Sequence, residues 1–516
     1  MSQAPTARSW SETLSLIAQR KVLIMLLLGF SAGVPILLIF SSLSLWLKEA
    51  EVSRSTITFF SWAALGYSFK FIWAPLIDQL PLPMLTRKLG RRRSWMLVSQ
   101  LAVIVSIITL ALSEPSEQLA ITAIAAVMLG FSSATQDIVI DAYRIESATG
   151  DMQSMLSSAY IAGYRVGMLA AGAGALYIAG WLGVEGSYTP TAWTIAYLCM
   201  AAAMLLGVAT TLCIKEPKGD NATPIGALSN RDIIRFLLSF LICVAVFALA
   251  FSVLHSAGSS TKAYLLEQVT ANKRLAGFLA ESLKLWLSIG AAALTAWALI
   301  RLKAAPKEML IAGYVQPVRD FFNKFGRLAL LILLLIALYR VADIVMGVIA
   351  NLFYADLGFS KAEIATYSKT YGLFATLAGG FLGGIIAIKY GVYRALLSGA
   401  ILSAATNVLF AFIASATKSG VLLMLTITAD NISGGIATAA FVAYLSSLTS
   451  VSFTAMQYAI FSSLMTLFPK LLAGYSGAMS TSLGYQDFFY LTALMGIPAV
   501  ALVILLSRLI PINAKS

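Results

Sequence analysis

The chain consists of long apolar stretches separated by short polar or charged connections. A helix needs about 20 apolar residues to cross a hydrocarbon layer of ~30 Å, and stretches of that length recur along the whole sequence. They are continuous rather than alternating between apolar and polar positions, which argues against a membrane β-barrel. The pattern predicts an all-α polytopic membrane protein with fourteen transmembrane helices. The expected helices are 22–47, 56–80, 95–113, 118–143, 154–182, 190–214, 233–256, 285–300, 328–350, 363–388, 395–416, 421–447, 454–483 and 488–507.

Composition agrees with this class of protein. Of the 516 residues, 59% are hydrophobic and only 11% are charged, which excludes an ordinary soluble globular protein. The 36 Lys and Arg residues outnumber the 23 Asp and Glu residues, and we interpret this excess of +13 as membrane orientation rather than nucleic-acid binding. The three cysteines lack metal-ligand spacing, so neither a disulfide nor a metal site is expected, and no cofactor is predicted.

The basic residues gather in alternate connections. The connection that contains Arg91 and the segment 301–327 are rich in Lys and Arg, whereas 114–117 and 183–189 contain neither. Basic connections of membrane proteins face the cytoplasm, so both termini are expected there. The long connection from 257 to 284 is then expected on the outer side.

The spacing of the helices predicts three parts. These are a six-helix bundle at 1–214, cytoplasmic loops with two added helices at 215–327, and a second six-helix bundle at 328–516. Two comparable halves are typical of secondary transporters, which move one half against the other. The halves therefore favour a transport function.

A short sequence similarity between the two halves supports their origin by duplication. Gly90 and Arg93 in KLGRRRSW correspond to Gly391 and Arg394 in IKYGVYRA. Glycine permits a tight turn, and cations can hold such a loop against helix ends or carboxylates. The alternative is that these loops carry only the orientation signal. We assign an inner gate to the basic residues of the first loop, Arg91, Arg92 and Arg93.

Three stretches of the first half carry a resemblance to a known family. KFIWAPLIDQLPLP at 70–83, LGRRRSW at 89–95 and ATQDIVIDAYRIE at 134–146 resemble the AmpG-type anhydromuropeptide permeases of the major facilitator superfamily. The two added helices agree with that family. The loop between Asp78 and Gly90 is longer than the superfamily's usual acidic, glycine and basic signature.

The resemblance implies a major facilitator fold and a cargo. For AmpG-type permeases it implies proton-driven import of N-acetylglucosaminyl-1,6-anhydro-N-acetylmuramyl peptides across the bacterial inner membrane. That import serves cell-wall recycling and, in some bacteria, β-lactamase induction. Relatives that share part of the pattern transport acetyl-CoA, so another anionic cargo, such as acetyl-CoA or a different glycopeptide, stays open. The partners expected are this cargo, protons and the lipid bilayer, and the protein is expected to be a monomer.

The first half carries charged residues within its apolar helices. Asp137 and Asp141 are four residues apart, and Arg144 follows on nearly the same helical face. Two neighbouring carboxylates resist simultaneous ionisation, so this face is a candidate for proton coupling or gating, with Asp78 as a further candidate. The alternative is a static latch in which Arg144 and the basic loop neutralise the acids.

Two cations are expected near the middle of the membrane. Lys70 lies about 15 Å of helix rise from the inner end of its helix, and Arg165 is similarly deep. They are candidates for binding anionic groups of a substrate, although pairing with Asp78 or the acids of the fourth helix would also account for them. Tyr67 and Tyr164 are candidates for stacking on sugar rings or for helix packing.

The second half also contains candidates. Arg340 and Asp343 are three residues apart and could neutralise each other, whereas Asp430 has no close basic neighbour in its own helix. Asp430 is a candidate for proton exchange, and it could bind sugar hydroxyls together with Asn431. The alternative is a buried ion pair across helices, with Lys369 or Lys470 as the cation. Arg340 is also a substrate-binding candidate. The one histidine lies outside both halves, so carboxylates are the expected proton carriers.

Enzymatic functions find no support in the sequence. It contains no HExxH, GxSxG or Walker A motif, so a metalloprotease, a serine hydrolase and an ATP-driven pump are disfavoured. A receptor would require a soluble signalling domain, and the chain has no room for one. The sequence predicts a transporter and not an enzyme.

Overall fold

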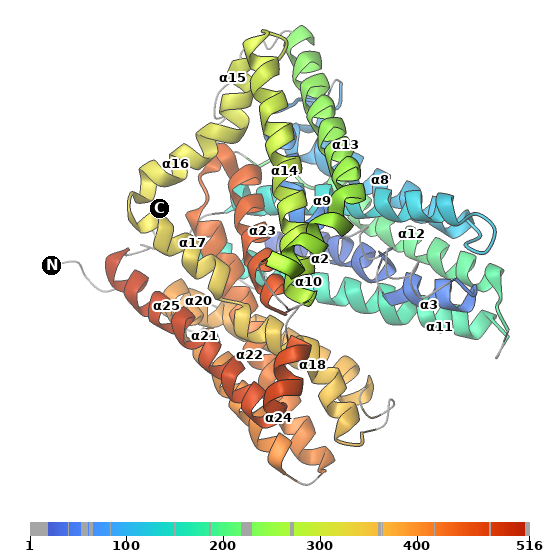
Figure 1. The fold of residues 1–516 in the computed structure, drawn as a ribbon, viewed down its shortest axis with the longest axis vertical. Coiled ribbons are helices and arrows are strands. Elements are labelled where there is room, and N and C mark those ends of the chain that lie inside the picture. Colours follow the sequence, from blue (N-terminus) through green and yellow to red (C-terminus); the bar gives the residue numbers. More distant parts are fainter. Residues whose placement is uncertain are drawn as a thin grey trace. The chain divides into compact units, whose positions relative to one another are not determined.

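The structure is a computed structural model in which every regular element is a helix within the described residues (Figure 1). It describes residues 19–39, 41–52, 60, 65–82, 84–148, 151–184, 187–217, 230–268, 273–359, 363, 365–416, 418–473 and 476–510. The chain forms two compact units. One combines Met1–Asn221 with Asp320–Ser516, and the other is Ala222–Arg319.

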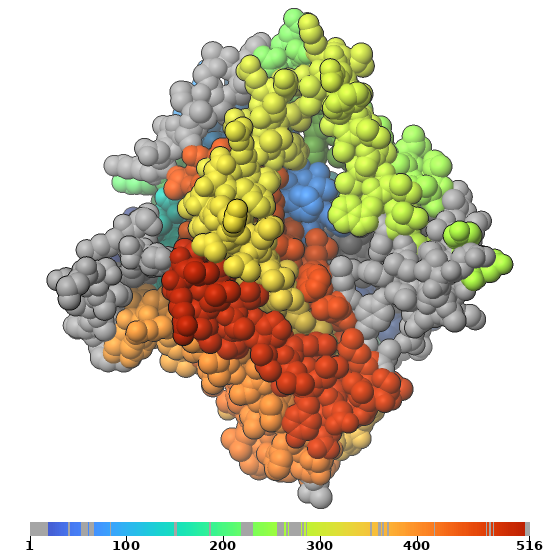
Figure 2. All heavy atoms as spheres, turned by 60° about the vertical axis from the view of Figure 1, so that its left-hand side comes forward, coloured from blue at the N-terminus to red at the C-terminus, as the bar shows by residue number. Residues whose placement is uncertain are grey.

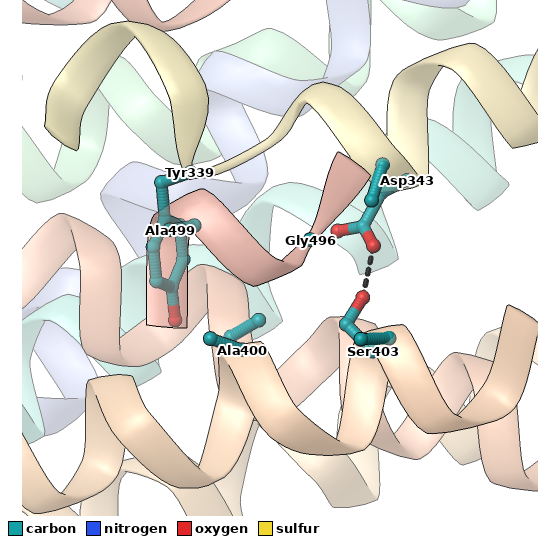
Figure 3. A pocket seen from close by; sticks show the side chains of 9 residues that line it. Tyr339, Asp343, Ala400, Ser403, Gly496 and Ala499 are labelled. Atoms are coloured by element: carbon teal, nitrogen blue, oxygen red, sulfur yellow. Dashed lines mark hydrogen bonds between the residues drawn. The ribbon is translucent and has the colours of Figure 1, made fainter. Parts of the chain in front are cut away.

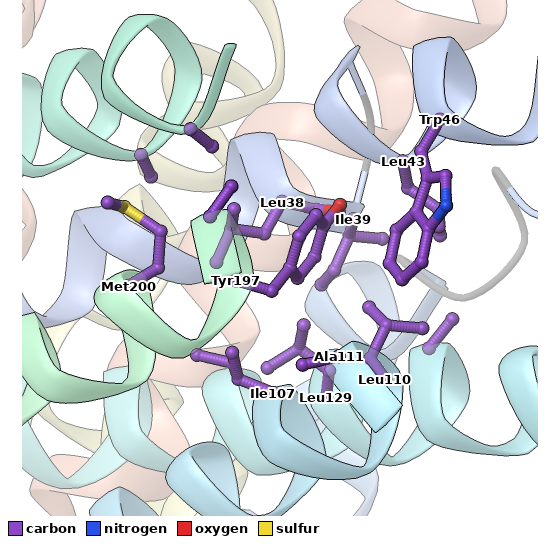
Figure 4. Close-up of a cluster of buried hydrophobic side chains, with 14 of the residues drawn as sticks. Leu38, Ile39, Leu43, Trp46, Ile107, Leu110, Ala111, Leu129, Tyr197 and Met200 are labelled. Carbon is purple, nitrogen blue, oxygen red and sulfur yellow. The ribbon is translucent and has the colours of Figure 1, made fainter. Parts of the chain in front are cut away.

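The first half of the larger unit is a bundle of apolar helices. Its elements are α2 (Arg20–Ile39), α3 (Ser41–Glu49), α5 (Leu65–Phe69), η2 (Lys70–Ile72), α6 (Ala74–Gln79), α7 (Leu85–Leu89), α8 (Arg91–Leu112), α9 (Leu119–Ser147), α10 (Asp151–Leu169), η3 (Ala170–Gly174), α11 (Ala175–Leu182) and α12 (Pro190–Cys213). Their facing sides form an apolar cluster in which Tyr197 lies among Leu38, Ile107 and Leu129 (Figure 4). Burial of this cluster holds α2, α8, α9 and α12 together.

The second half has its own apolar core. Its elements are α17 (Leu328–Leu338), α18 (Val341–Asp356), η5 (Ala365–Tyr371), α20 (Gly372–Tyr390), α21 (Val392–Ser415), α22 (Gly420–Leu448), η6 (Val451–Phe453), α23 (Thr454–Ala473), α24 (Ser476–Met495) and α25 (Ile497–Leu509). Phe353 of α18 lies edge-on to Phe489 of α24, with 4.8 Å between ring centroids. The surfaces of α17 and α25 lie side by side (Figure 2).

The smaller unit is built on a helix pair. α13 (Asn230–Gln268) packs against α14 (Lys273–Arg301), and α15 (Lys307–Leu310) with η4 (Ile311–Val315) follows. Both helices extend into the stretch 257–284 that the sequence predicts as a connection outside the membrane, because α13 continues to Gln268 and α14 begins at Lys273. The apolar stretches themselves end at Leu254 and begin again at Trp286. Hydropathy marks where a helix leaves the hydrocarbon layer, whereas the helix itself continues through residues that favour it.

The predicted count of fourteen transmembrane helices is not confirmed. Among the described residues, twelve helices are long and apolar enough to cross a membrane. The predicted helix 56–80 falls partly outside the described residues, and its remainder is divided into α5, η2 and α6. The predicted helix 285–300 falls in the shorter apolar stretch Trp286–Arg301 of α14.

The two glycines that the sequence pairs occupy the same position in their halves. Gly90 precedes α8 with φ 89° and ψ 170°, and Gly391 precedes α21 with φ 88° and ψ 158°. This backbone region is open almost only to glycine. Both turns therefore require the residue that the sequence places there.

Candidate functional site

Asp141 lies at the centre of a buried group of charges. Its Oδ1 accepts a hydrogen bond from Arg144 Nη2 at 2.9 Å, and its Oδ2 is 3.7 Å from Lys70 Nζ. Arg144 Nη1 also donates to Ser157 at 2.7 Å and to Ser446 of the second half at 2.8 Å. The carboxylate of Asp141 is thus neutralised by two cations, one of which also contacts the second half.

Asp137 lies one helical turn before Asp141 in α9 and differs from it. Its Oδ1 is buried and has no hydrogen-bond partner among the described residues. A buried carboxylate oxygen without a partner is costly when charged, so the site favours a proton on Asp137 or the arrival of a polar ligand. Two carboxyl groups on one face therefore have unequal surroundings.

A second group of charges joins the two halves at the end of the bundle that carries the basic loop. Arg92 Nη2 is 2.8 Å from Asp78 Oδ1 and 2.6 Å from Glu146 Oε1, and it donates to Thr454 Oγ1 at 2.8 Å. Thr454 in turn donates to Glu146 at 2.6 Å. We call Asp78, Arg92, Glu146 and Thr454 the inner gate cluster, after the inner gate that the sequence predicts for the basic loop. Thr454 belongs to the second half and the other three residues belong to the first.

The backbone of α23 completes this contact. Asp78 Oδ1 accepts from the N–H of Ala455 at 3.3 Å, and Oδ2 accepts from the N–H of Met456 at 2.9 Å. The first N–H groups of a helix have no partner inside it and attract negative charge. Asp78 of the first half therefore caps a helix of the second half.

The other two arginines of the basic loop have different partners. Arg91 donates to the carbonyl oxygen of Asp78 at 2.6 Å, while Arg93 donates to the carbonyl oxygens of Thr211 and Leu212 at 3.1 and 2.8 Å. All three arginines lie in the first turn of α8, so the predicted helix start at residue 95 is too late. Only Arg92 of the three forms a side-chain hydrogen bond with the second half in the part of the chain that the structure describes.

Glu216 explains the early start of this helix. Its two carboxylate oxygens accept from the N–H of Arg92 at 2.7 Å and from that of Arg93 at 3.1 Å. Sequence reasoning missed Glu146, Glu216 and Thr454. Glu146 lies in the stretch QDIVIDAYRIE that carries the other acids, so its position was a usable signal. The partners of Glu216 and Thr454 lie too far away along the chain to be inferred.

The remaining first-half candidates lie in the same helices. Tyr67 OH is 2.5 Å from Ser133 Oγ in α9, and the ring of Tyr164 is 6.0 Å from that of Tyr160. Arg165 is half-buried and forms no hydrogen bond or ion pair within the described ranges. Of the two predicted midplane cations, Lys70 thus has a carboxylate near it, whereas Arg165 has none among the described residues.

The second-half candidates form a group around a break in the chain's helices. Arg340 lies between α17 and α18, and its Nε is 3.2 Å from Asp343 Oδ2. Asp343 also accepts a hydrogen bond from Ser403 beside a small cavity lined by Tyr339, Ala400, Gly496 and Ala499 (Figure 3). The sequence-predicted pair of Arg340 and Asp343 is therefore brought together.

Asp430 and Asn431 are adjacent in α22 but have separate partners. Asp430 Oδ1 accepts from Thr406 at 3.2 Å. Asn431 donates to the carbonyl oxygen of Ile427 at 2.8 Å and accepts from Thr376 at 2.8 Å. Each end of the Asn431 amide thus makes one hydrogen bond within the bundle, which leaves its second N–H and the second acceptor site of its oxygen for a ligand.

Comparison with known proteins identifies the family. Residues 21–178 match the family model described as acetyl-coenzyme A transporter 1. The putative transporter AmpG 3 of Rickettsia prowazekii (strain Madrid E) is 30% identical over 465 residues, which cover 90% of each chain. The chain belongs to the AmpG family of transporters. Another AmpG relative, the anhydromuropeptide permease of Escherichia coli (strain K12), is 28% identical over 496 residues, covering 96% of this chain and 81% of that protein.

Solved structures give the fold of this AmpG-family chain. It is similar to the proton:xylose symporter XylE, with a TM-score of 0.58 at 13% identity over 96% of each chain. It is also similar to the transporter FucP in the outward conformation, with a TM-score of 0.57 at 8% identity over 94% of this chain and 98% of that one. The chain therefore has the major facilitator fold. Since its relatives are named as transporters and permeases, the chain is a multi-pass membrane transporter rather than an enzyme.

Proposed function

We propose that this AmpG-family transporter imports anhydromuropeptides, that is GlcNAc-1,6-anhydroMurNAc and its peptides, together with protons by alternating access. The import would cross the bacterial inner membrane and serve cell-wall recycling and β-lactamase induction. The name of the Escherichia coli relative supports this cargo. The basic connections support cytoplasmic termini, and a single chain with two halves is sufficient for the cycle, so we propose a monomer.

The unequal surroundings of Asp137 and Asp141 carry the proposal of proton coupling. Asp141 lies between Lys70 and Arg144, whereas Asp137 has a buried oxygen without a partner among the described residues. Asp141 is stabilised as a carboxylate by its two cations, whereas the buried oxygen without a partner favours the carboxylic acid at Asp137. We therefore assign the transported proton to Asp137 and the balancing negative charge to Asp141. Asp343 and Asp430 are the next candidates.

Anionic cargo has cations to bind in the same region. Lys70 is held at 3.7 Å from Asp141, which is longer than a hydrogen bond, so a carboxylate of the cargo can compete for it. Arg165 and Arg340 are further cations, the second already paired with Asp343. Tyr67 and Tyr164 offer rings for the sugars.

Alternating access requires a contact that closes one side and opens again. The inner gate cluster supports this role because Arg92, Asp78 and Glu146 of the first half meet Thr454 of the second half in a buried group. Opening the gate would separate these partners and return the charges to water. We propose that proton and cargo binding near Asp137 alters how readily this happens.

Acetyl-CoA is the second candidate cargo, because the family model that matches residues 21–178 is described as an acetyl-coenzyme A transporter. Acetyl-CoA also carries several negative charges, so Lys70 and Arg165 would suit it.

Uptake into proteoliposomes tests the proposed function. Labelled anhydromuropeptide should accumulate with an inward proton gradient, and unlabelled acetyl-CoA should not compete. A protonophore should stop accumulation, whereas ATP should have no effect. Accumulation of acetyl-CoA but not of the muropeptide would show that the cargo is acetyl-CoA instead. Accumulation that is unaffected by the protonophore would refute proton coupling.

A further inference from the structure

The connection that leads into the second half ends in a short amphipathic helix, α16 (Gln316–Phe325). Phe321 is buried, and its ring centroid lies 5.1 Å from that of Phe461 in α23. Lys324 Nζ donates to the carbonyl oxygen of Leu448 at 3.3 Å, where α22 ends. A cation is favourable at this end of a helix. α16 is thus anchored to two helices of the second half.

Asp320 of α16 binds the turn between those two helices. Its Oδ2 accepts from Ser450 Oγ at 2.5 Å and from Gln457 Nε2 at 3.0 Å. Gln457 Oε1 in turn accepts from the N–H of Ser450 at 2.7 Å. The three residues form a closed ring of hydrogen bonds around the start of α23, and hydrogen bonds to a charged group are the stronger kind.

The same turn of α23 faces the first half. Thr454 belongs to the inner gate cluster, and the N–H groups of Ala455 and Met456 bind Asp78. Residues 454–456 thus contact the first half, while Gln457 contacts α16. Gln457 fixes the turn that precedes α23. The N–H groups of Ala455 and Met456, which have no partner inside the helix, are therefore held where Asp78 can accept their hydrogen bonds.

We propose that Asp320 is a positioning residue for the inner gate. It holds Ser450 and Gln457 so that the start of α23 presents its N–H groups to Asp78, and it thereby stabilises the closed gate. This role rests on the alternating access proposed above, and it does not depend on which cargo or ion is transported. Loss of the Asp320 carboxylate leaves the gate closed less often.

Thiol labelling of the full-length protein tests this role without cargo or a proton gradient. In a variant without the three native cysteines, Ser158→Cys is the gate reporter. Ser158 is buried in α10 and faces α20 of the second half, where a Cβ built on Gly384 would lie 2.2 Å from its Oγ. Ala126→Cys, in the apolar core of the first half, reports general loosening.

Asp320→Ala should raise the labelling rate of the gate reporter by about tenfold or more, as expected for loss of hydrogen bonds to a charged group. Gln457→Ala should have a similar effect, and the double variant should add little, since both remove the same ring. Asp320→Asn keeps an acceptor and should give a smaller rise. Arg319→Gln is the matched control, because Arg319 is exposed and changes charge on the same helix.

Three results would overturn the proposal. They are an unchanged labelling rate in Asp320→Ala, an equal rise in Arg319→Gln, and a parallel rise of the Ala126→Cys reporter. The uptake experiment measures cargo and proton dependence separately. If the proposed cargo is not taken up, the labelling result still tests the role of Asp320. If labelling does not change in Asp320→Ala, the uptake result still tests the proposed cargo.

Discussion

Arg92 and Arg93 are neighbours in α8, yet we predict that only Arg92 controls the inner gate. The Arg92 side chain is 1% exposed and pairs with Asp78 and Glu146, whose side chains are 8% and 5% exposed. Arg92→Gln removes the cation that is hydrogen-bonded to both buried acids when the gate is closed, whereas an open gate would give the acids water. Removing one partner of a buried ion pair costs about 3–5 kcal/mol.

This cost destabilises the closed state, in which the acids are buried, and not the open state, in which water reaches them. It therefore shifts the equilibrium between the closed and the open inner side. At 1.4 kcal/mol per factor of ten, about 3–5 kcal/mol corresponds to a shift of about 100- to 4,000-fold toward the open inner side. Arg93→Gln removes the same charge one residue away, but its partners are the carbonyl oxygens of Thr211 and Leu212 in the first half. These contacts do not change when the halves separate.

Labelling of Ser158→Cys in the cysteine-free protein measures this difference. The reporter cysteine should be labelled far faster in the Arg92→Gln protein than in the parent. In the Arg93→Gln protein it should be labelled at nearly the parent rate, although that protein should unfold at a lower temperature. The reasoning is refuted if both variants label equally fast, or if Arg92→Gln labels no faster than the parent. In the first case the basic loop would act through its total charge, and in the second it would serve orientation only.

Three further predictions concern transport, binding and stability. Asp137→Asn should abolish proton-driven accumulation in proteoliposomes but retain exchange of cargo, since exchange needs no net proton movement; retained accumulation would move the proton to Asp343 or Asp430. Lys70→Gln and Arg165→Gln should weaken binding of a carboxylate-bearing muropeptide more than binding of its peptide-free sugar in calorimetry, and equal losses would indicate a scaffold role. Gly90→Ala should destabilise the protein by about 1–3 kcal/mol in thermal unfolding, because φ is 89° and a Cβ would lie 2.4 Å from the Glu216 carboxyl carbon; an unchanged melting temperature would contradict this.

Much of the helical layout could be predicted from apolar length alone. The expected helix 190–214 corresponds to Pro190–Cys213, and 118–143 corresponds to Leu119–Ser147. Errors arose where a helix continues beyond the apolar stretch, as α13 does to Gln268, and where a polar first turn begins a helix, as Arg91 does in α8. Apolar length reports the membrane, whereas helix ends depend on capping groups that lie elsewhere in the chain.

The candidate site could be predicted in part for a similar reason. Asp141 and Arg144 are three residues apart, so their ion pair follows from helical spacing. Arg92 and Thr454 are 362 residues apart, and no periodicity brings them together. The sequence therefore indicates which residues are charged within apolar helices, while the folded bundle decides which of them meet.

The contact of Asp78 with α23 has a consequence for how this protein can vary. Asp78 binds main-chain N–H groups of Ala455 and Met456, not their side chains. Every residue except proline supplies the same donor, so exchanges at these two buried positions leave that contact intact where the new side chain fits. Variation that affects this contact is therefore expected at Asp78 itself and at the residues that position the first turn of α23, such as Gln457, rather than in the side chains of Ala455 and Met456.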